Sequence, residues 1–297
     1  MKIVFMGCVQ FSESCLRDLL KQKNKHYHVA GVVTRKASSF NSDFTSLQPV
    51  AARHKIPYFL ADQHNEENLV KWLHEICPDV IYCFGWSWLL QKTILEIPRL
   101  GVIGYHPAKL PYNRGRHPII WALALGLKQT ASTFFFMDEK ADTGDILDQK
   151  NVKISKTDYA HDLYQRLLKI AKQQIPTFSL ALASGEFKRG KQPADHGNTW
   201  RKRSEGDGAI DWRMSAETIY NLIRALAKPY PGAVCRYNGK KFAVWRSQVV
   251  TNLKDNCEPG KILNASKKHF TIKCGGASAL QILSHDIPQC PKAGEYL

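Results

Sequence analysis

The first hundred residues alternate between short apolar runs and segments with helical periodicity, and this alternation restricts the fold more than any other feature. Leu16, Leu19 and Leu20 recur at helical spacing, for example. Apolar runs occur at residues 2–6, 28–34 and 80–84. Strands that alternate with helices form a parallel sheet with helices on its faces. The sequence therefore predicts an α/β fold with a Rossmann-like, mostly parallel sheet.

The turn after the first strand argues against a dinucleotide-dependent dehydrogenase. Residues 7–12 read GCVQFS and lack the GxGxxG pattern that lets a backbone approach a pyrophosphate. Ligands of such sheets still bind beside the carboxyl ends of the strands. Phe84-Gly85-Trp86 and Tyr105-His106 follow apolar runs, so we expect them at this edge of the sheet.

The last ninety residues have a different pattern. Ser215 opens an amphipathic segment that Pro229 and Pro231 close, and Asn238-Gly239 between two short β-rich runs is a hairpin signal. Further short β-rich runs predict a small β-rich, OB-like domain. The basic, aperiodic stretch before it is a linker by composition. The predicted organisation is a catalytic domain at 1–186, a linker at 187–208 and a C-terminal helix with a small barrel at 209–297.

Composition excludes several classes of function. The eight cysteines form no CxxC pair, the eleven histidines have no metal-binding spacing, and no apolar run is long enough to span a membrane. We therefore expect no metal, no membrane partner and a cytoplasmic location. The net charge of +16 fits either a spread basic surface or attraction to a polyanion or phosphorylated substrate. The densest basic cluster has no interleaved aromatic stacking motif, which is weak support for nucleic acid.

A histidine and an aspartate that are distant in the chain have the chemistry of a base and its orienting partner. His106 follows an apolar run and precedes a loop rich in Pro, Arg and Gly, and Asp142 begins the acidic sequence DTGD. A carboxylate that orients an imidazole suits proton transfer from a nucleophile. From spacing alone, a structural histidine bonded to a backbone carbonyl is the alternative.

The surrounding residues are similar to a known signature. HPAKLPYNRG at 106–115, followed by Pro118 and Trp121, resembles the HxSxLPxxRG signature of formyltransferases that use 10-formyltetrahydrofolate. DTGDI at 142–146 resembles that family's acidic loop. Segments 200–203, 210–212, 223–225 and 229–233 resemble its C-terminal domain. The likeness covers nearly the whole chain, and the combined pattern is specific although each piece alone is weak.

The resemblance implies a reaction in which an amine attacks the formyl carbon of the folate. His106 would then be the base or proton shuttle, and Asp142 would orient it and favour its charged form. The family usually has an Asn two residues before the histidine, which donates to the oxyanion, but Gly104 stands there. One such donor is worth on the order of 3 kcal/mol. We expect a backbone N–H, a water, Asn113 or His117 to replace it.

The resemblance also implies binding residues. The folate would lie near Phe84, Gly85 and Trp86 and the loop that contains Asp138 and Lys140. Ordinary hydrophobic packing is the alternative for the tryptophan. The predicted substrate-binding residues are Lys109, Arg114 and Arg116; the two arginines flank Gly115 and carry planar donors that suit a phosphate or a folate glutamate tail.

Two branches of the family differ in the amine that they formylate. The Arg-Gly-Arg sequence at 114–116 and the PYPGA sequence at 229–233 resemble the branch that formylates nucleotide-linked amino sugars for lipopolysaccharide O-antigen. Relatives in that branch are often dimers, so a homodimer is also expected. The charge of +16 suits the alternative, a methionyl-tRNA formyltransferase. The missing Asn leaves a second alternative, a non-catalytic binder of folate or nucleotide sugar.

Overall fold

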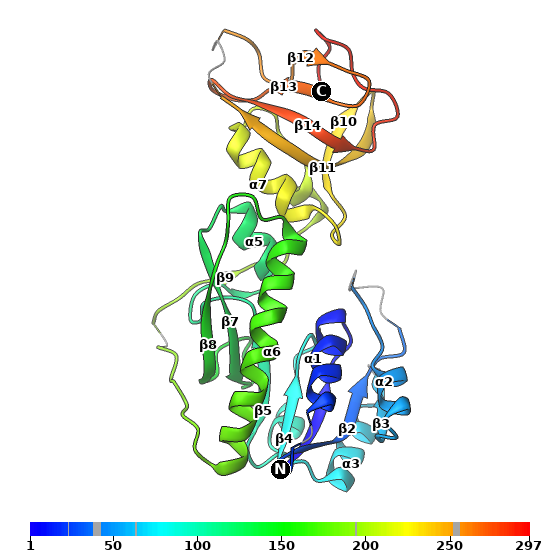
Figure 1. The fold of residues 1–297 in the computed structure, drawn as a ribbon, viewed down its shortest axis with the longest axis vertical. Coiled ribbons are helices and arrows are strands. Elements are labelled where there is room, and N and C mark those ends of the chain that lie inside the picture. The colour runs from blue at the N-terminus through cyan, green and yellow to red at the C-terminus, as the bar shows by residue number, and fades with distance from the viewer. Residues whose placement is uncertain (23, 38–42, 63, 194, 252–255) are drawn as a thin grey trace. The chain divides into compact units, whose positions relative to one another are not determined.

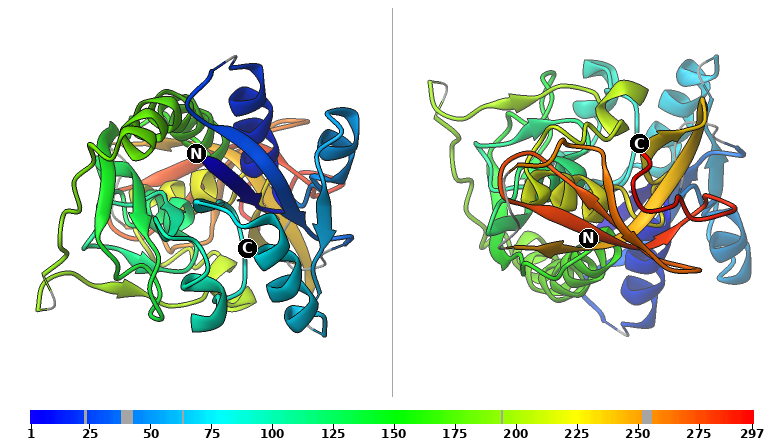
Figure 2. Two further views of the ribbon diagram at one scale, coloured as in Figure 1. Left: turned by 90° about the horizontal axis from the view of Figure 1, so that it is seen from below. Right: turned by 90° about the horizontal axis from the view of Figure 1, so that it is seen from above.

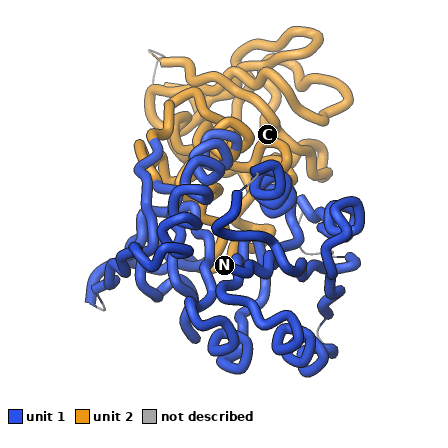
Figure 3. The backbone as a smooth tube through the Cα atoms, turned by 60° about the horizontal axis from the view of Figure 1, so that its bottom comes forward, with its two compact units in different colours: residues 1–115, 131–152, 165–200 blue, residues 116–130, 153–164, 201–297 orange. Residues whose placement is uncertain are grey.

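The computed structural model describes residues 1–22, 24–37, 43–62, 64–193, 195–251 and 256–297, and the chain divides into two compact units (Figures 1 and 3). Unit 1 comprises residues 1–115, 131–152 and 165–200. Unit 2 comprises residues 116–130, 153–164 and 201–297. The predicted domain ranges 1–186, 187–208 and 209–297 remain a proposal; in the structure, residues 187–200 make their contacts within unit 1.

A seven-stranded sheet in the order β3-β2-β1-β4-β5-β7-β8 forms the centre of unit 1. The pairs β1–β2, β1–β4, β2–β3 and β4–β5 are parallel, whereas β5 and β7 are antiparallel. The bounds are β1 Lys2–Met6, β2 His28–Thr34, β3 Tyr58–Leu60, β4 Val80–Cys83, β5 Val102–His106, β7 Gln129–Phe136 and β8 Ile146–Lys153. The predicted mostly parallel sheet is confirmed, and its antiparallel part lies beyond β5.

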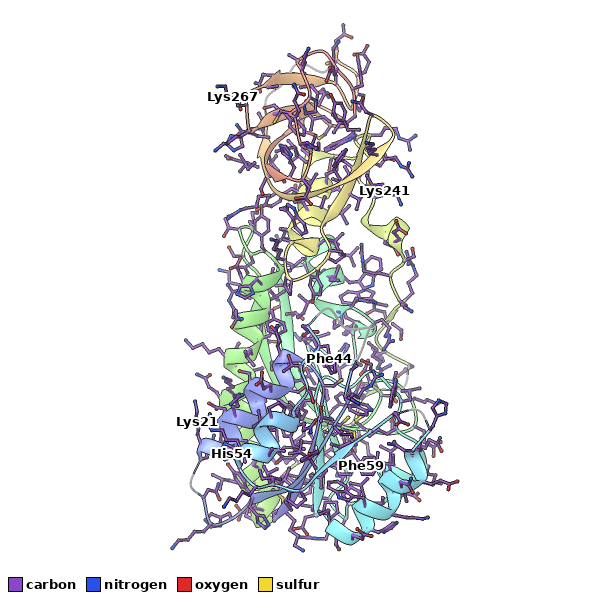
Figure 4. All side chains as sticks on the ribbon, turned by 90° about the vertical axis from the view of Figure 1, so that its right-hand side faces the viewer. Lys21, Phe44, His54, Phe59, Lys241 and Lys267 are labelled. Carbon is purple, nitrogen blue, oxygen red and sulfur yellow. The ribbon has the colours of Figure 1, made fainter. Side chains whose placement is uncertain are left out.

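Alternation of side chains along the strands gives this sheet two apolar faces. On one face, Val4 and Met6 of β1 belong to a buried cluster with Leu69 and Leu73 of α3. On the other face, the buried Tyr82 donates to or accepts from Ser179 Oγ of α6 at 2.7 Å. The helices are α1 Gln10–Lys21, α2 Gln48–Arg53, α3 Glu66–Ile76, α4 Lys92–Leu95 and α6 Ala160–Ser184. Phe59 of β3, labelled in Figure 4, packs against Trp72 with ring centroids 5.8 Å apart.

Unit 2 contains helices α5, Pro118–Ala124, and α7, Ala216–Leu226, which contact each other, and a five-stranded antiparallel sheet in the order β10-β11-β14-β13-β12 (Figures 1 and 2). Its strands are β10 Ala233–Tyr237, β11 Lys240–Val250, β12 Ile262–Ala265, β13 Phe270–Lys273 and β14 Ala279–His285. The separate β-rich C-terminal part is thus confirmed.

Two local predictions in unit 2 are confirmed by backbone geometry. Ser215 is the N-cap of α7 and accepts a hydrogen bond from the Thr218 N–H at 3.2 Å. Asn238 and Gly239 connect β10 to β11 with φ of 49° and 75°. Positive φ at both positions is what a two-residue hairpin of this hand requires, and Asn-Gly satisfies it at low cost.

The N-terminal end of α6 is satisfied by a side chain of the helix itself. α6 begins at Ala160. The Tyr159 N–H donates to the Asp162 carboxylate at 2.9 Å. In the described part of the chain, no helix is long and apolar enough to cross a membrane.

Candidate active site

His106 is the last residue of β5, at the edge where the parallel strands end. It pairs with Thr133 of β7, and the residue as a whole is only 4% exposed. The Thr133 hydroxyl donates to the Ala108 carbonyl at 2.7 Å, which ties the chain after His106 to the neighbouring strand. The sheet therefore fixes both the backbone of the histidine and the beginning of the loop that follows it.

The imidazole of His106 lies between two hydrogen-bond acceptors. Its Nδ1 is 3.5 Å from Oδ2 of Asp142, and its Nε2 is 2.7 Å from the Asn113 carbonyl oxygen. A carbonyl can only accept, so Nε2 carries a proton in this arrangement. The structure thus combines the predicted carboxylate pair with the carbonyl bond expected of a structural histidine.

The carboxylate of Asp142 is held by the backbone N–H of Gly115. Its φ is +59°, a left-handed conformation that is uncommon for residues other than glycine. Its Oδ2 accepts the Gly115 N–H at 2.8 Å, so the same oxygen faces both His106 and the end of the arginine-containing loop. At Gly144 a Cβ would lie 1.7 Å from the Phe136 carbonyl oxygen, so only glycine fits there.

Arg114 is engaged with a residue that the sequence analysis did not select. Its Nε and one Nη donate to Oε1 of Gln192 at 3.2 and 2.8 Å. The Gln192 Nε2 in turn donates to the carbonyl oxygens of Asp142 and Gly144 at 3.0 and 2.7 Å. The predicted role of Arg114 in substrate binding stays a prediction, and its guanidinium already helps to shape the acidic loop.

The position of the absent Asn is closed by apolar side chains. A Cβ on Gly104 would lie 2.8 Å from Cζ of Phe135 and 2.9 Å from Cγ of Met137. A larger residue would therefore need these side chains to move. Of the two side chains expected to substitute, Asn113 has φ of 64° and follows in the same loop as His106, and His117 belongs to unit 2.

The three residues predicted at the folate slot have different environments. The Phe84 ring is fully buried among Phe5, Tyr82 and Phe134, and its carbonyl accepts a hydrogen bond from Ser12. Gly85 has φ of +66°, and a Cβ there would lie 2.2 Å from Val9. Trp86 packs against the buried cluster that contains Leu69 and Leu73 of α3, which is the ordinary hydrophobic packing given above as the alternative to folate binding.

One polar atom at this slot is nevertheless available to a ligand. The Trp86 Nε1–H is buried without a hydrogen-bond partner among the described residues. Because a buried N–H without a partner costs free energy, such an atom is a reasonable place for an acceptor on a bound molecule.

Asp138 and Lys140 shape the acidic loop from within. One oxygen of Asp138 accepts the Lys140 N–H at 3.0 Å and the Thr143 hydroxyl at 2.7 Å. Both bonds stabilise the turn that leads into Asp142. The Lys140 side chain is exposed, so this residue contributes through its backbone in the structure as it stands.

Lys109 and Arg116 are both exposed, and Arg116 belongs to unit 2, as does its neighbour His117. Burial, followed by the charges of Arg116 and Arg203, lowers the pKa of His117. The His117 Nε2 is buried and has no partner among the described residues. Within unit 1 the structure brings His106, Asp142 and Arg114 together.

Two polar residues of the segment 187–200 were missed because nothing in their sequence marks them. Besides Gln192, Asn198 accepts the Asn113 N–H through Oδ1 at 2.8 Å. The short strands β6, Arg114–Gly115, and β9, Thr199–Trp200, pair in parallel beside it. Composition alone made this stretch a linker, because the side-chain bonds of Gln192 and Asn198 go to residues between 48 and 85 positions away.

Family models match both parts of the chain. The model described as formyl transferase covers residues 1–178, and the model described as formyl transferase, C-terminal domain, covers residues 202–293. The chain belongs to the formyltransferase family. This membership confirms the predicted enzyme class, a formyltransferase.

Two curated relatives of this formyltransferase have different names. The bifunctional polymyxin resistance protein ArnA of Wigglesworthia glossinidia brevipalpis is 34% identical over 83% of this chain, which spans only 37% of that protein's length. A methionyl-tRNA formyltransferase of Caldanaerobacter subterraneus subsp. tengcongensis is 32% identical over 100% of this chain and 96% of its own. Sequence identity alone therefore does not separate the two branches.

Two solved structures share the fold over most of their length. One is WlaRD, a sugar 3N-formyl transferase, in the presence of dTDP and 5-N-formyl-THF, with a TM-score of 0.70, 18% identity, and coverage of 95% of this chain and 97% of that one. The other is the N-formyltransferase of Helicobacter canadensis with folinic acid and dTDP-3-aminofucose, with a TM-score of 0.71, 17% identity, and coverage of 95% and 99%.

Proposed function

We propose that this formyltransferase moves a formyl group from 10-formyltetrahydrofolate to the amine of a nucleotide-linked amino sugar, with His106 and Asp142 handling the proton. The observation that carries the proposal is the pair itself. An imidazole at the end of β5 has a carboxylate oxygen 3.5 Å from Nδ1, in a chain of the formyltransferase family. A base and its orienter are what an attacking amine requires.

The folate supplies a formyl group that an amine can attack. On the protein side, Nδ1 of His106 faces Asp142, so Nε2 is the nitrogen that meets the amine. Nε2 now donates to the Asn113 carbonyl at 2.7 Å. To accept the amine proton it must leave this partner, and the single proton of the neutral ring must lie on Nδ1, which faces Asp142. Asp142 then stabilises the resulting imidazolium by charge. The buried Trp86 Nε1–H and the backbone of 84–86 and 138–142 would hold the folate.

The nature of the acceptor rests on separate support. The sequence Arg114-Gly115-Arg116 resembles the sugar branch. Two of the solved structures that cover 95% of this chain are described with dTDP or with dTDP-3-aminofucose. The ArnA relative, named for polymyxin resistance, is consistent with a product destined for a surface polysaccharide such as O-antigen. A cytoplasmic enzyme and a homodimer are part of the same proposal.

Methionyl-tRNA is the second candidate acceptor. A relative of that name is 32% identical over the whole chain, and the net charge of +16 suits binding of RNA. A third candidate, a non-catalytic binder, is motivated by Gly104 and opposed by the retained His106–Asp142 pair.

A panel of acceptors tests the proposal. The protein is incubated with 10-formyltetrahydrofolate and with dTDP- or UDP-linked sugars that carry the amine at C3 or C4, and with methionyl-tRNA; mass spectrometry measures the formylated product. Turnover of a sugar at a kcat/KM at least a hundredfold above that of methionyl-tRNA supports the proposal. Formylation of the tRNA alone, with binding that falls steeply with salt, overturns it in favour of translation. Folate binding without any turnover overturns the proposal in favour of the non-catalytic binding protein.

A further inference from the structure

The segment between α6 and β9 lies against both loops of the candidate active site. Gly190 and Ile146 exchange two backbone hydrogen bonds, at 2.7 and 2.8 Å, directly after the acidic loop. Eight positions further on, the Asn198 side chain accepts the Asn113 N–H at 2.8 Å, and the Asn198 carbonyl oxygen accepts the Arg114 N–H at 3.0 Å. Gln192 therefore stands between two points at which the segment is fixed.

The side-chain amide of Gln192 makes four hydrogen bonds. Its Nε2 donates to the carbonyl oxygens of Asp142 and Gly144, and its Oε1 accepts from Nε and one Nη of Arg114. An amide has two N–H donors and two acceptor sites, so its capacity is fully used. Carbonyls only accept and a guanidinium only donates, so the partners also fix which end of the amide is oxygen.

These four bonds and the Gly115 N–H form a closed set of contacts that includes the Asp142 carboxylate. Gln192 hydrogen-bonds to the backbone on both sides of Thr143, in the loop that carries the carboxylate. It also hydrogen-bonds to Arg114, whose neighbour Gly115 donates its N–H to the carboxylate at 2.8 Å. The oxygen that accepts this bond is the one 3.5 Å from His106 Nδ1. One side chain thus connects the loop that carries the carboxylate to the loop that orients it.

We propose that Gln192 is a positioning residue for formyl transfer: it holds the acidic loop so that Asp142 faces His106. This inference rests on the proposed roles of His106 and Asp142. The φ of +59° at Asp142 has to be maintained by its surroundings, and the bond from Gln192 to the Asp142 carbonyl is one of the contacts that maintain it. Displacement of a catalytic group by about an ångström can cost on the order of a hundredfold in rate.

Two substitutions separate the donor function of the Gln192 side-chain amide from its acceptor function. Q192A removes all four bonds. Q192E keeps the acceptors for Arg114 but cannot donate to the Asp142 and Gly144 carbonyls, because an ionised carboxylate only accepts. We expect both variants to lower kcat by tenfold or more, with the KM of each substrate changed less than threefold. Retention of kcat within threefold in Q192A, or a normal kcat in Q192E, overturns the proposal.

Gln174 provides a control for stability. It is 3% exposed and donates through Nε2 to the Ser132 carbonyl and to the Asp148 carboxylate at 3.2 and 3.1 Å. Q174A therefore also removes amide hydrogen bonds within unit 1. We expect it to lower Tm at least as much as Q192A does while kcat stays within about twofold. An equal fall of kcat in Q174A would mean that the effect of Q192A reflects general destabilisation.

A double variant tests whether Gln192 acts through Asp142. In the D142N background the catalytic carboxylate is already gone, so Q192A should lower kcat by less than a further twofold. If the fold-losses of kcat in Q192A and D142N instead multiply in the double variant, Gln192 does not act through Asp142, and the proposal is overturned.

Hydrogen exchange gives a readout that does not depend on the acceptor. In Q192A we expect faster amide exchange in peptides that cover 138–146 and 113–117, and unchanged exchange in β1 and β4. Unchanged exchange in both loops would overturn the positioning role even if a sugar is turned over. Faster exchange without turnover of any sugar by the unsubstituted protein would instead count against the proposed acceptor alone.

Discussion

The Nε2 atom of His106 donates to the Asn113 carbonyl at 2.7 Å, and this bond occupies the ring nitrogen that does not face Asp142. The loop between these two residues therefore has to yield before the imidazole can receive a proton from a substrate. Hydrogen bonds of this kind are often rearranged when a substrate binds. The buried ring, held between a carboxylate and a carbonyl, is consistent with a base that is released only when the amine arrives.

Replacement of either member of the pair should reduce the rate of formyl transfer. We expect H106A and D142N each to lower kcat by about a hundredfold or more, the range of general acid–base catalysis. Asn at 142 can still accept the Gly115 N–H, so D142N should keep the loop folded while it removes the charge. Steady-state kinetics with an accepted amine, and Tm as a control for folding, measure both effects. A loss of less than tenfold would refute the assigned role.

The local features of this fold could be predicted from the sequence because their causes are local. The Asn238-Gly239 turn and the Ser215 cap depend on residues within a few positions of each other. The strands Lys2–Met6 and His28–Thr34 are marked by their own apolar runs. His106 and Asp142 were found because the motif around each is contiguous.

The remainder of the site depends on contacts between distant segments. Gln192 bonds to Asp142, fifty positions away, and its neighbours are basic and aperiodic, so composition made it part of a linker. The closed space beside Gly104 is set by Phe135 and Met137 of the next strand and the turn after it. The antiparallel direction of β7 also follows from tertiary packing, because its apolar pattern is equally compatible with a parallel strand.

Gly104 should not tolerate a side chain unless its neighbours change. G104A places a Cβ 2.8 Å from the Phe135 ring, and we expect it to lower the free energy of unfolding by about 1–3 kcal/mol. F135L removes the two Phe135 ring atoms that clash and leaves Met137 Cγ, so the double variant should lose less than the sum of the two single losses. Urea unfolding measures the coupling. G206A, whose Cβ would lie 3.8 Å from its nearest neighbour, is the control, and equal losses in both alanine variants would contradict this interpretation.

The stability of unit 2 should depend on acid through Asp207, in the 3₁₀ helix Glu205–Gly208. The Arg201 guanidinium and the Ser204 N–H donate to this carboxylate and hold its pKa below the usual range. A carboxylate with a lowered pKa in the folded state stabilises the fold above its ordinary pKa. That contribution is lost as pH falls through the lowered pKa.

We therefore expect that, as pH is lowered from about 4, Tm falls more steeply in the unsubstituted protein than in D207N. The carboxylate is near the surface, and at roughly 0.5 M salt charges are screened within a few ångströms. Salt at this concentration should therefore reduce the difference in Tm between the two proteins. Parallel Tm profiles of the two proteins across this range would exclude Asp207 as the source.

Arg224 should be the most sensitive position of unit 2. It lies on α7, is 3% exposed, and its guanidinium donates to the carbonyl oxygens of Ser155 and Asp158 at 3.2 and 3.0 Å. The Asn221 side chain accepts from its Nε at 2.8 Å. Burial lowers the pKa of this arginine, but the carbonyls around it match its planar donors.

In R224M the Asp158 carbonyl loses the donor that Arg224 supplies, whereas the Ser155 carbonyl keeps the Asp158 N–H at 3.2 Å. A buried carbonyl that loses its donor costs about 1–3 kcal/mol, so we expect a loss of about 1–3 kcal/mol in the free energy of unfolding. R224K keeps the charge but not the fork of donors, and it should recover only part of the loss. The exposed Arg213, which pairs with Asp211, is the matched control, and R213M should leave Tm unchanged. If R224M and R213M unfold at the same denaturant concentration, the buried guanidinium does not hold the 153–164 segment to α7.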